Sequence, residues 1–397
     1  MTQFPAAPAG DAATIAAIRN EIERQGGRIT FARFMDLALY HPEFGYYLRP
    51  ERRPGRGGDF LTAPETHPFF GVALARQIAD CWELLGRPAP FTIREYGAGV
   101  GGLAYDILVG LSRETPAVLP AVRYRLIEPN AHQRAQALTA LTEIGFGHIV
   151  EAETPAAAAD AAPIVGVALA NEAADALPVH RLVWRDAALG FVECYVAYEH
   201  GGFVEVEGPL SPEAAAFAPV ARLRAAGVIL GDGDRVEIGP AAAAWFGSVA
   251  RGLDRGYAIV IDYGYDTAEL YRDHRLAGTL RAYRAHTVTD DPFAAVGASD
   301  LTAHVDFGAL RAAGEANGLA FAGLTTQGAL LASLGLGDLL VELGHDPETT
   351  APEYMAAQAA IVRLVDPGGM GRFRVLLMAK NAPAAPLRGL SERGPKF

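Results

Sequence analysis

The sequence has little cysteine and no long apolar run. Its 397 residues include two cysteines, Cys81 and Cys194, too few for a disulfide framework or a cysteine metal site. No apolar run reaches the roughly 18 residues that a membrane-spanning helix needs. The first eleven residues show neither the apolar segment of a signal peptide nor an Arg-rich amphipathic pattern. We therefore expect a protein without membrane insertion, located in the cytoplasm of a bacterium, with Cys81 as a small core residue.

The sequence also lacks an excess of positive charge. Its formal net charge of −12 argues against broad binding to nucleic acid or to anionic membranes. One local exception is the stretch 49–56, which holds four arginines in eight residues. We interpret it as a solvated flexible loop, and contact with an acidic partner is the alternative.

Half of the residues are hydrophobic and a fifth are charged, as in ordinary globular proteins. The length suits one elaborated domain or two. We predict a core in two parts, residues 67–178 and 257–380. A helical region with a loop, residues 1–66, precedes this core, an insertion on its ligand side covers 179–256, and a flexible tail covers 381–397.

A glycine-rich turn dominates the first half of the chain. A short β-type run over 91–95 ends at Glu95, glycines crowd at positions 97, 99, 101 and 102, and a helix-compatible run follows. Glycine lets a backbone approach a ligand closely, and a helix N-terminus offers free N–H groups. The turn fits two cofactors. Gly97-x-Gly99-x-x-Gly102 satisfies the dinucleotide fingerprint, whereas Glu95-x-Gly97-x-Gly99-x-Gly101 resembles the S-adenosylmethionine (SAM) loop of methyltransferases.

A second acid follows the next strand, 122–128. Glu128 ends this run 26 residues after Gly102. In a βαβ unit this position can hydrogen-bond the ribose hydroxyl pair that both cofactors carry. A surface carboxylate at a strand end is the alternative interpretation.

Polar residues also follow the fourth and fifth predicted strands. Asn171, Glu172 and Asp175 come directly after the apolar run 163–170, and Asp262 and Tyr263 come at the end of 257–264. Ligands of open α/β sheets lie beyond the carboxyl ends of the strands, so these residues are predicted to reach a ligand. A capped helix start is the simpler account of Asn171 and Asp175.

Periodicity places most of the remaining elements. Helices are predicted over 11–25, 31–40, 70–85, 214–224 and 307–318, and core strands over 91–95, 122–128, 147–151, 163–170, 257–264, 321–327 and 373–379. Segment 154–162 is predicted as an Ala-rich linker, and 278–286 and 300–306 as irregular polar loops. Because His286 and His304 lack a metal-ligand spacing, we assign no metal. About seven core strands with helices between the early ones predict an α/β doubly wound sheet.

Thr62 has two interpretations. With Glu65 it forms the pattern of a capping box, which would explain both residues as a helix start. Alternatively, the segment 58–65 is a loop aimed at the glycine turn.

Several blocks in this order resemble one known family. They are Gly58-Asp-Phe-Leu-Thr-Ala-Pro-Glu65, the glycine turn, Asn171-Glu-x-x-Asp-Ala-Leu-Pro-Val179, Ile261-Asp-Tyr-Gly264, Gly278-Thr-Leu280 and Asp300-Leu-Thr-Ala-His-Val-Asp-Phe307. The series is similar to the MidA/NDUFAF7 type of SAM-dependent methyltransferase, from about residue 29 to 379. The resemblance implies a class I methyltransferase fold, Rossmann-like with a mostly parallel seven-stranded sheet. Mitochondrial relatives of this type methylate an arginine on a complex I subunit and support assembly of that complex.

Site roles follow from the positions and the resemblance together. Cofactor binding is assigned to the strand-end acids, the loop glycines and two polar residues: Glu95, Gly97, Gly99, Gly101, Glu128, Asn171 and Thr62. An arginine acceptor needs carboxylates to hold its guanidinium. Glu172 and Asp175 are the candidates, with Asp262 and Tyr263 as a second wall of the site.

Two departures from the family pattern bear on these roles. The family usually has Leu-Gly-Pro-Gly-Arg-Gly where this chain has Tyr96-Gly-Ala-Gly-Val-Gly101, so one arginine is missing near the site. Two phenylalanines of the family are replaced by Ala173 and Ala174, which predicts a wider or reshaped pocket.

The expected function is therefore SAM-dependent methylation of an arginine on a protein partner of the complex I subunit type, with a role in assembly. Two alternatives stay open at this point. The first is a Rossmann oxidoreductase that binds NAD(P), and the second is a non-catalytic assembly factor that grips a protein partner.

Overall fold

The computed structural model describes residues 10–49, 61–186, 190–272, 277–284, 287–383 and 387–391. The chain forms two compact units, each assembled from separate stretches. The first unit consists of Met1–Phe60, Ala174–Ala244 and Gly264–Ala309, and the second of Leu61–Ala173, Trp245–Tyr263 and Leu310–Phe397. The chain therefore leaves the second unit after Ala173 and returns to it at Trp245.

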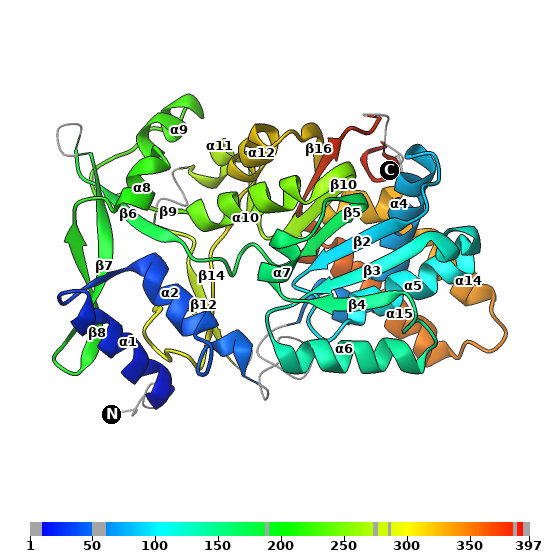
Figure 1. Ribbon diagram of the computed structural model, residues 1–397, viewed down its shortest axis with the longest axis horizontal. Helices are drawn as coiled ribbons and strands as arrows, with labels where there is room; N and C mark the ends of the chain where they lie inside the picture. Colours follow the sequence, from blue (N-terminus) through cyan, green and yellow to red (C-terminus); the bar gives the residue numbers. More distant parts are fainter. Residues whose placement is uncertain are drawn as a thin grey trace. The chain divides into compact units, whose positions relative to one another are not determined.

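The second unit is built on a seven-stranded sheet (Figure 1). In spatial order its strands are β16 (Ala320–Thr326), β17 (Arg374–Lys380), β10 (Leu253–Asp262), β5 (Ile164–Asn171), β2 (Phe91–Tyr96), β3 (Val122–Ile127) and β4 (Val150–Glu153). The pairs from β10 to β4 are parallel, whereas β17 is antiparallel to both β10 and β16. The predicted α/β sheet with about seven strands is confirmed, and it is a mixed sheet.

Helices cover both faces of this sheet, as buried strands require. The helices of the second unit are α3 (Ala63–Thr66), α4 (Phe69–Leu84), α5 (Gly102–Glu114), α6 (Ala131–Glu143), α7 (Pro155–Asp160), α13 (Gln327–Ser333), α14 (Leu336–His345) and α15 (Ala351–Val365), with short 3₁₀ turns η2 (Pro116–Ala121), η4 (Met370–Arg372) and η5 (Arg388–Leu390). Helices α10 (Pro240–Arg251) and α12 (Phe307–Ala316) end in this unit.

Alternating strand residues divide the core between the two faces. One face shares a hydrophobic core with α4, α5, α13 and α14 that includes Phe91, Ile93 and Leu377. On the other face Met378 lies against α12, because a Cβ on Gly314 would stand 2.7 Å from its Sδ. Cys81 is fully buried in the first of these cores, as predicted.

The first unit holds two helices from the N-terminal region and three small sheets. Its helical elements are α1 (Ala12–Arg24), α2 (Phe31–Tyr40), η1 (Tyr46–Leu48), α8 (Pro212–Ala216), α9 (Pro219–Ala225) and α11 (Thr267–Leu270). The first sheet has the strand order β1 (Ile29–Thr30), β7 (Phe191–Glu199), β6 (His180–Trp184) and β9 (Arg235–Ile238), and β8 (Gly202–Gly208) pairs with β7. The second sheet has the order β13 (Thr287–Thr289), β12 (Arg281–Arg284) and β14 (Asp300–Thr302), and the third is the pair β11 (Gly264–Tyr265) and β15 (Val305–Asp306). Two hydrophobic clusters hold them together.

Several predicted elements need correction. The expected linker 154–162 contains α7, because the Thr154 hydroxyl caps it (3.2 Å from Ala157 N) and alanine is the best helix former. The expected helix 214–224 is two helices, because Pro219 cannot continue α8 and Ala218 turns to φ 50°.

Other corrections concern loops. The segments 278–286 and 300–306, expected to be irregular, contain β12, β14 and β15. Arg49 is held by Asp11 and Thr14, both at 2.8 Å, so it is no part of a solvated loop, and residues 50–56 lie outside the described part of the chain. Helices α13 to α15 were not predicted. In the predicted tail Leu387 is buried.

No single helix in the described ranges has the length and apolarity to cross a membrane. Helices α13 and α14 meet that test only as a pair, bent by 54° at their junction.

Candidate active site

The glycine turn has the predicted strand–turn–helix form. It connects β2 to α5, and Gly97, Gly99 and Gly101 adopt φ values of 74°, 54° and 81°. These left-handed conformations are easy for glycine and costly for other residues. Gly101 is the N-cap residue of α5, so the turn leads directly into a helix N-terminus.

Close contacts on one side of the turn contrast with open space on the other. A Cβ on Gly101 would stand 2.9 Å from Ala137 Cβ, and one on Gly97 would stand 3.0 Å from Ala173 Cβ. A Cβ on Gly99 would meet nothing nearer than Gln133 Oε1 at 3.8 Å, and one on Gly102 no described atom within 4 Å. The first-turn N–H groups of a helix have no intrahelical partner. The turn therefore has the room and the donors to accept a ligand against its backbone.

Glu128 lies directly beside this turn. Its carboxylate accepts hydrogen bonds from Gly99 N (3.0 Å) and Asn130 N (2.8 Å), and the side chain is 6 % exposed. Burial raises the pKa of Glu128, while these backbone donors and Arg134 act in the opposite direction. Each carboxylate oxygen has a second lone pair, so the predicted contact with a ribose hydroxyl pair fits the geometry.

Glu95 lies on the core face of β2. Its Oε2 accepts a hydrogen bond of 2.6 Å from the hydroxyl of Tyr124, a fully buried residue of β3. Burial raises the pKa of Glu95 to about 7. The carboxylate thus links two strands beneath the glycine turn, and a direct cofactor contact of Glu95 stays a prediction.

The end of β5 has an unusual backbone. Glu172 has φ 49°, a conformation that costs a non-glycine residue about 1–3 kcal/mol. Its Oε1 accepts from Ala63 N of α3 (2.8 Å) and from Asn171 Nδ2 (3.0 Å). Asn171 Oδ1 is buried and has no hydrogen-bond partner among the described residues. Residues 172–178 form no helix, so the capped-helix interpretation of this block is wrong.

Asp262 ties this corner to β10. It is fully buried, and it accepts from Ala173 N (3.1 Å) and from Tyr263 N (2.7 Å). Burial raises the pKa of Glu172 to about 7; the charges of Asp262 and Glu65 add to this effect, and the hydrogen bonds from Ala63 and Asn171 oppose it. Glu172 therefore changes charge near neutral pH.

Thr62 fits both of its interpretations. It begins α3 in a capping box with Glu65 (Thr62 Oγ1 to Glu65 Oε2, 3.2 Å). The next residue, Ala63, donates its N–H to Glu172, so this segment also lies at the site. Residues 58–60 of the same sequence block are outside the described ranges.

The last two candidates differ in placement. The hydroxyl of Tyr263 accepts a hydrogen bond from Arg372. Asp175 belongs to the first unit, where its carbonyl accepts from Ala303 N at 3.0 Å. The described contacts within the second unit thus join Glu172, Asp262 and Tyr263 without Asp175. Ala63, Tyr124 and Arg372 were missed, because nothing local in the sequence marks them as partners.

Two further sequence blocks are explained within the first unit. Glu237 of β9 accepts from Thr279 N (2.6 Å), and Gly278 must lack a side chain because a Cβ would stand 2.7 Å from Glu237 Oε1. His304 N in turn donates to Thr279 Oγ1 at 3.3 Å. The Gly-Thr-Leu block is therefore anchored to the buried Glu237 carboxylate, and Thr279 connects it to His304 of the Leu-Thr-Ala-His block.

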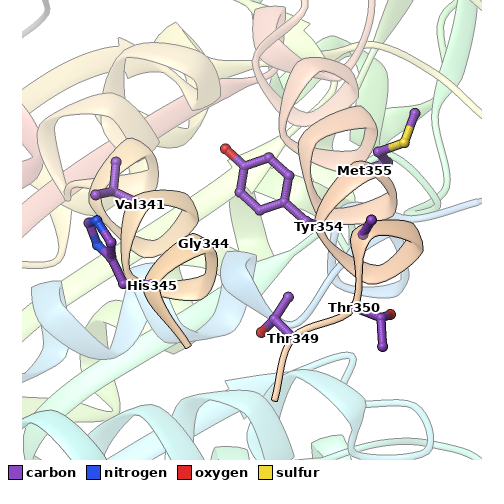
Figure 2. Close-up of a pocket in the computed structure, with 8 residues that line it drawn as sticks. Val341, Gly344, His345, Thr349, Thr350, Tyr354 and Met355 are labelled. Carbon is purple, nitrogen blue, oxygen red and sulfur yellow. The ribbon is translucent and has the colours of Figure 1, made fainter. Parts of the chain in front are cut away.

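A separate hollow of about 540 Å³ lies between α14 and α15 (Figure 2). Figure 2 shows Val341 and His345 on one helix and Tyr354 and Met355 on the other. None of the predicted site residues lines it, and its Thr350 caps α15 through Glu353.

Along the carboxyl edge of the sheet, the site follows the strand order. Glu128 follows β3, and the glycine turn follows β2. Asn171 ends β5 and Asp262 ends β10, with Glu172 and Tyr263 directly after them. A glycine turn at a helix N-terminus beside a strand-end acid defines a nucleotide-cofactor enzyme of the α/β class. The mixed sheet, in which the antiparallel strand β17 lies between β10 and the edge strand β16, is that of an α/β methyltransferase.

Comparison with known proteins identifies the family. The model described as "Putative S-adenosyl-L-methionine-dependent methyltransferase" matches residues 73–325, and the chain belongs to this family. A solved structure, a "likely methyl transferase from Burkholderia thailandensis bound to S-adenosyl-homocysteine", is 33 % identical with a TM-score of 0.83, covering 96 % of this chain and 95 % of that chain. The cofactor is SAM.

Two relatives are named more specifically. The "Protein arginine methyltransferase NDUFAF7 homolog, mitochondrial" of Drosophila melanogaster is 28 % identical over 387 residues, covering 91 % of this chain and 84 % of its own length. The NDUFAF7 protein arginine methyltransferase of Danio rerio is 28 % identical over 363 residues, covering 82 % and 78 %. The predicted resemblance is confirmed, and SAM in place of NAD(P) rules out the oxidoreductase alternative.

Proposed function

We propose that this chain is a class I methyltransferase that transfers a methyl group to an arginine side chain of a protein. The observation that carries the proposal is the carboxylate of Glu172, fixed by Ala63 N and Asn171 Nδ2 next to the glycine turn. The names of the relatives support the arginine acceptor. The strand order and the antiparallel β17 support the class I assignment.

The residues of the edge would divide the binding of SAM among them. Glu128 would hold the ribose hydroxyls, the backbone from Gly97 to Gly101 would approach the methionine portion, and the buried Oδ1 of Asn171 would accept from a ligand donor. When bound, SAM supplies an electrophilic methyl group on its sulfonium. Since this reaction needs no protein nucleophile, the main task of the chain is alignment, which can be worth about 7–11 kcal/mol.

Glu172 would act on the acceptor. Because Oε1 of Glu172 already accepts from Ala63 N and Asn171 Nδ2, its Oε2 would accept a charge-assisted hydrogen bond from the guanidinium. With a pKa of about 7, Glu172 can also accept the proton that the guanidinium loses as its nitrogen is methylated, and release it to water afterwards. Asp262 fixes the corner that carries Glu172, through Ala173 N.

We further propose that the acceptor protein is a respiratory complex I subunit and that methylation aids assembly of that complex. This proposal rests on the family resemblance of the sequence blocks. Mass spectrometry of complex I subunits from a deletion strain and its parent tests it. An arginine methyl mark present in the parent and absent in the deletion strain is expected, and identical marks in both would contradict it.

A more general experiment tests the reaction itself. Protein extract from the deletion strain would be incubated with the purified enzyme and SAM tritiated on its methyl group, and then hydrolysed to amino acids. Tritium is expected in methylarginine. Tritium in another amino acid would contradict the arginine acceptor, and no transfer to any protein would contradict the proposed reaction.

A further inference from the structure

Arg372 contacts Tyr263 in two ways. Its Nη2 donates a hydrogen bond to the Tyr263 hydroxyl, and its Cζ lies 5.0 Å from the centroid of the Tyr263 ring. The Phe373 ring packs edge-on against the same ring, with centroids 5.4 Å apart and an interplanar angle of 75°. The hydroxyl and the ring plane of Tyr263 are thus both fixed from one short segment.

The turn that carries Arg372 has a tightly defined backbone. The N–H groups of Gly369 and Gly371 both donate to Asp366 O at 2.9 Å. A Cβ on Gly371 would stand 2.3 Å from the backbone of Val365, so this position requires glycine. Arg372 therefore projects from a turn with little freedom.

This turn closes a ring of contacts around Glu172. Met370 Sδ accepts from Thr66 Oγ1 of α3 (3.6 Å), and α3 donates Ala63 N to Glu172. On the other side, Tyr263 N and Ala173 N both donate to Asp262. Arg372 is the member of the ring that connects the turn to the end of β10.

The donor inventory then defines what Tyr263 can do. Arginine has donors only, so the Tyr263 oxygen accepts from Arg372 and the hydroxyl proton points away from it. The Tyr263 hydroxyl can therefore act as a hydrogen-bond donor. Nε of Arg372 is buried without a hydrogen-bond partner in the described part of the chain, so the described hydrogen bond of this guanidinium is the one to Tyr263.

The position of Arg372 and Tyr263 along the carboxyl edge of the sheet indicates which end of the site they occupy. β17 lies three strands from β2, which is roughly 14 Å at about 4.8 Å per strand. Because β17 is antiparallel to β10, its first residue and Arg372 lie at the same edge as the glycine turn. Glu128 and the turn occupy one end of this edge, and Tyr263 and Arg372 occupy the other.

We propose that Arg372 is a positioning residue for the methyl acceptor, which fixes the Tyr263 hydroxyl at the end of the edge that the cofactor leaves open. This inference rests on the proposed function. Arg372 acts through Tyr263, and Tyr263 contacts the acceptor.

The test compares Arg372→Ala, Arg372→Lys, Tyr263→Phe and the double variant with the wild type. The assay is tritium transfer from SAM to the deletion-strain extract, over a range of extract concentrations, alongside calorimetric titration with S-adenosylhomocysteine. We expect Arg372→Ala to lower transfer at low extract concentration about tenfold, the effect of losing one charge-assisted hydrogen bond. S-adenosylhomocysteine affinity should stay within about twofold, and Arg372→Lys, which keeps a donor, should recover part of the loss.

The double variant separates positioning from a merely structural role. If Arg372 acts through Tyr263, the double variant should transfer methyl no more slowly than Tyr263→Phe alone. Independent, multiplying losses would overturn the inference, as would a loss of S-adenosylhomocysteine affinity in the same proportion as transfer. If Arg372→Ala is too unstable to assay, the lysine variant carries the comparison, and Arg363→Ala on the exposed side of α15 serves as the control.

The two possible failures are distinguishable. A wild-type enzyme that transfers no methyl to protein contradicts the proposed function. A wild-type enzyme that transfers methyl, with Arg372→Ala unchanged, contradicts only the role of Arg372.

Discussion

The two ends of the sheet edge are built in different ways. At the proposed cofactor end, Glu128 accepts two backbone N–H groups, and these donors and the cation Arg134 oppose the rise in its pKa that burial causes. At the acceptor end, Glu172 lies near two other acids, Asp262 and Glu65, which help to raise its pKa to about 7. The first arrangement suits steady binding of a ribose, whereas the second keeps a carboxylate poised to change charge. Binding and reaction should therefore be separable by mutation.

The largest expected effect is on transfer at the acceptor end. Glu172→Gln keeps the shape and an acceptor for Ala63 N but removes the charge. Transfer to protein should fall about 10²–10⁴-fold, the range for loss of a positioned proton acceptor. Tritium incorporation into deletion-strain extract measures it, and unaltered turnover would remove Glu172 from the mechanism.

The next largest effect is expected on cofactor affinity, from a substitution in the glycine turn. Gly101→Val places a β-branched side chain at φ 81°, with its Cβ 2.9 Å from Ala137 Cβ. The left-handed strain alone costs roughly 1–2 kcal/mol, and the clash adds roughly 1–3 kcal/mol. The free turn can relieve these costs by leaving this conformation, which ligand binding must then restore. We expect S-adenosylhomocysteine affinity to fall by between about 30-fold and a few thousandfold in calorimetry, because a summed cost of roughly 2–5 kcal/mol converts at about 1.4 kcal/mol per tenfold.

A left-handed glycine outside the site is a matched control for this variant. Gly86 has φ 79°, and a Cβ there meets no described atom within 4 Å. Gly86→Val therefore carries the same kind of backbone strain away from the glycine turn, and it should bind S-adenosylhomocysteine like the wild type. Equal losses in both variants would show that the loss is not specific to the glycine turn.

A third prediction concerns pH. In the proposed mechanism the charged form of Glu172 is the active one. Since its pKa is about 7, kcat/KM for the acceptor should fall as pH drops through 7. The expected slope below that point is about tenfold per pH unit. A pH–rate profile from 5.5 to 8.5 checks it. A flat profile down to pH 5.5 would contradict an ionised Glu172 as the acting group.

The smallest effect on activity is expected from substitution of Glu95, which lies beneath the glycine turn and should affect mainly the stability of the fold. Its pKa is raised from 4.5 to about 7 in the folded protein, so the folded state binds more protons than the unfolded state between these values. The contribution of Glu95 to stability is greatest below pH 4.5 and is lost as pH rises through 7, by at most about 3 kcal/mol.

Glu95→Gln removes this titration while keeping an oxygen to accept from Tyr124. The difference in Tm between variant and wild type should therefore shift in favour of the variant as pH rises from 5 to 8. Thermal melts at several pH values measure it. A constant difference would show that the Glu95 carboxyl does not titrate in this range.

The cofactor end could be predicted from the sequence because its parts are close together in the chain. Glycines between a strand and a helix, with an acid at the end of the next strand, form a local pattern. The acceptor end could be predicted only in part. Glu172 and Asp262 stand out as polar residues after apolar strands, but their partners come from afar: both Ala63–Glu172 and Arg372–Tyr263 join residues 109 positions apart.

Asp175 illustrates a different limit. It was predicted to share the site with Glu172, and this role stays a prediction, because the chain passes from the second unit to the first between Ala173 and Ala174. A pattern of nearby residues does not reveal where a chain leaves a sheet. The short strands β12 and β14 were missed for a similar reason, because their pairing partners, not their own apolar periodicity, make them strands.

One calorimetric comparison tests most directly whether Glu128 serves the cofactor and Glu172 the acceptor. S-adenosylhomocysteine would be titrated into Glu128→Gln and Glu172→Gln under identical conditions. We predict that Glu128→Gln weakens binding by about tenfold or more, as expected for hydrogen bonds to a charged group, while Glu172→Gln stays within about twofold of the wild type. Equal weakening in both variants, or the reverse order, would contradict the assignment of Glu128 to the cofactor and Glu172 to the acceptor.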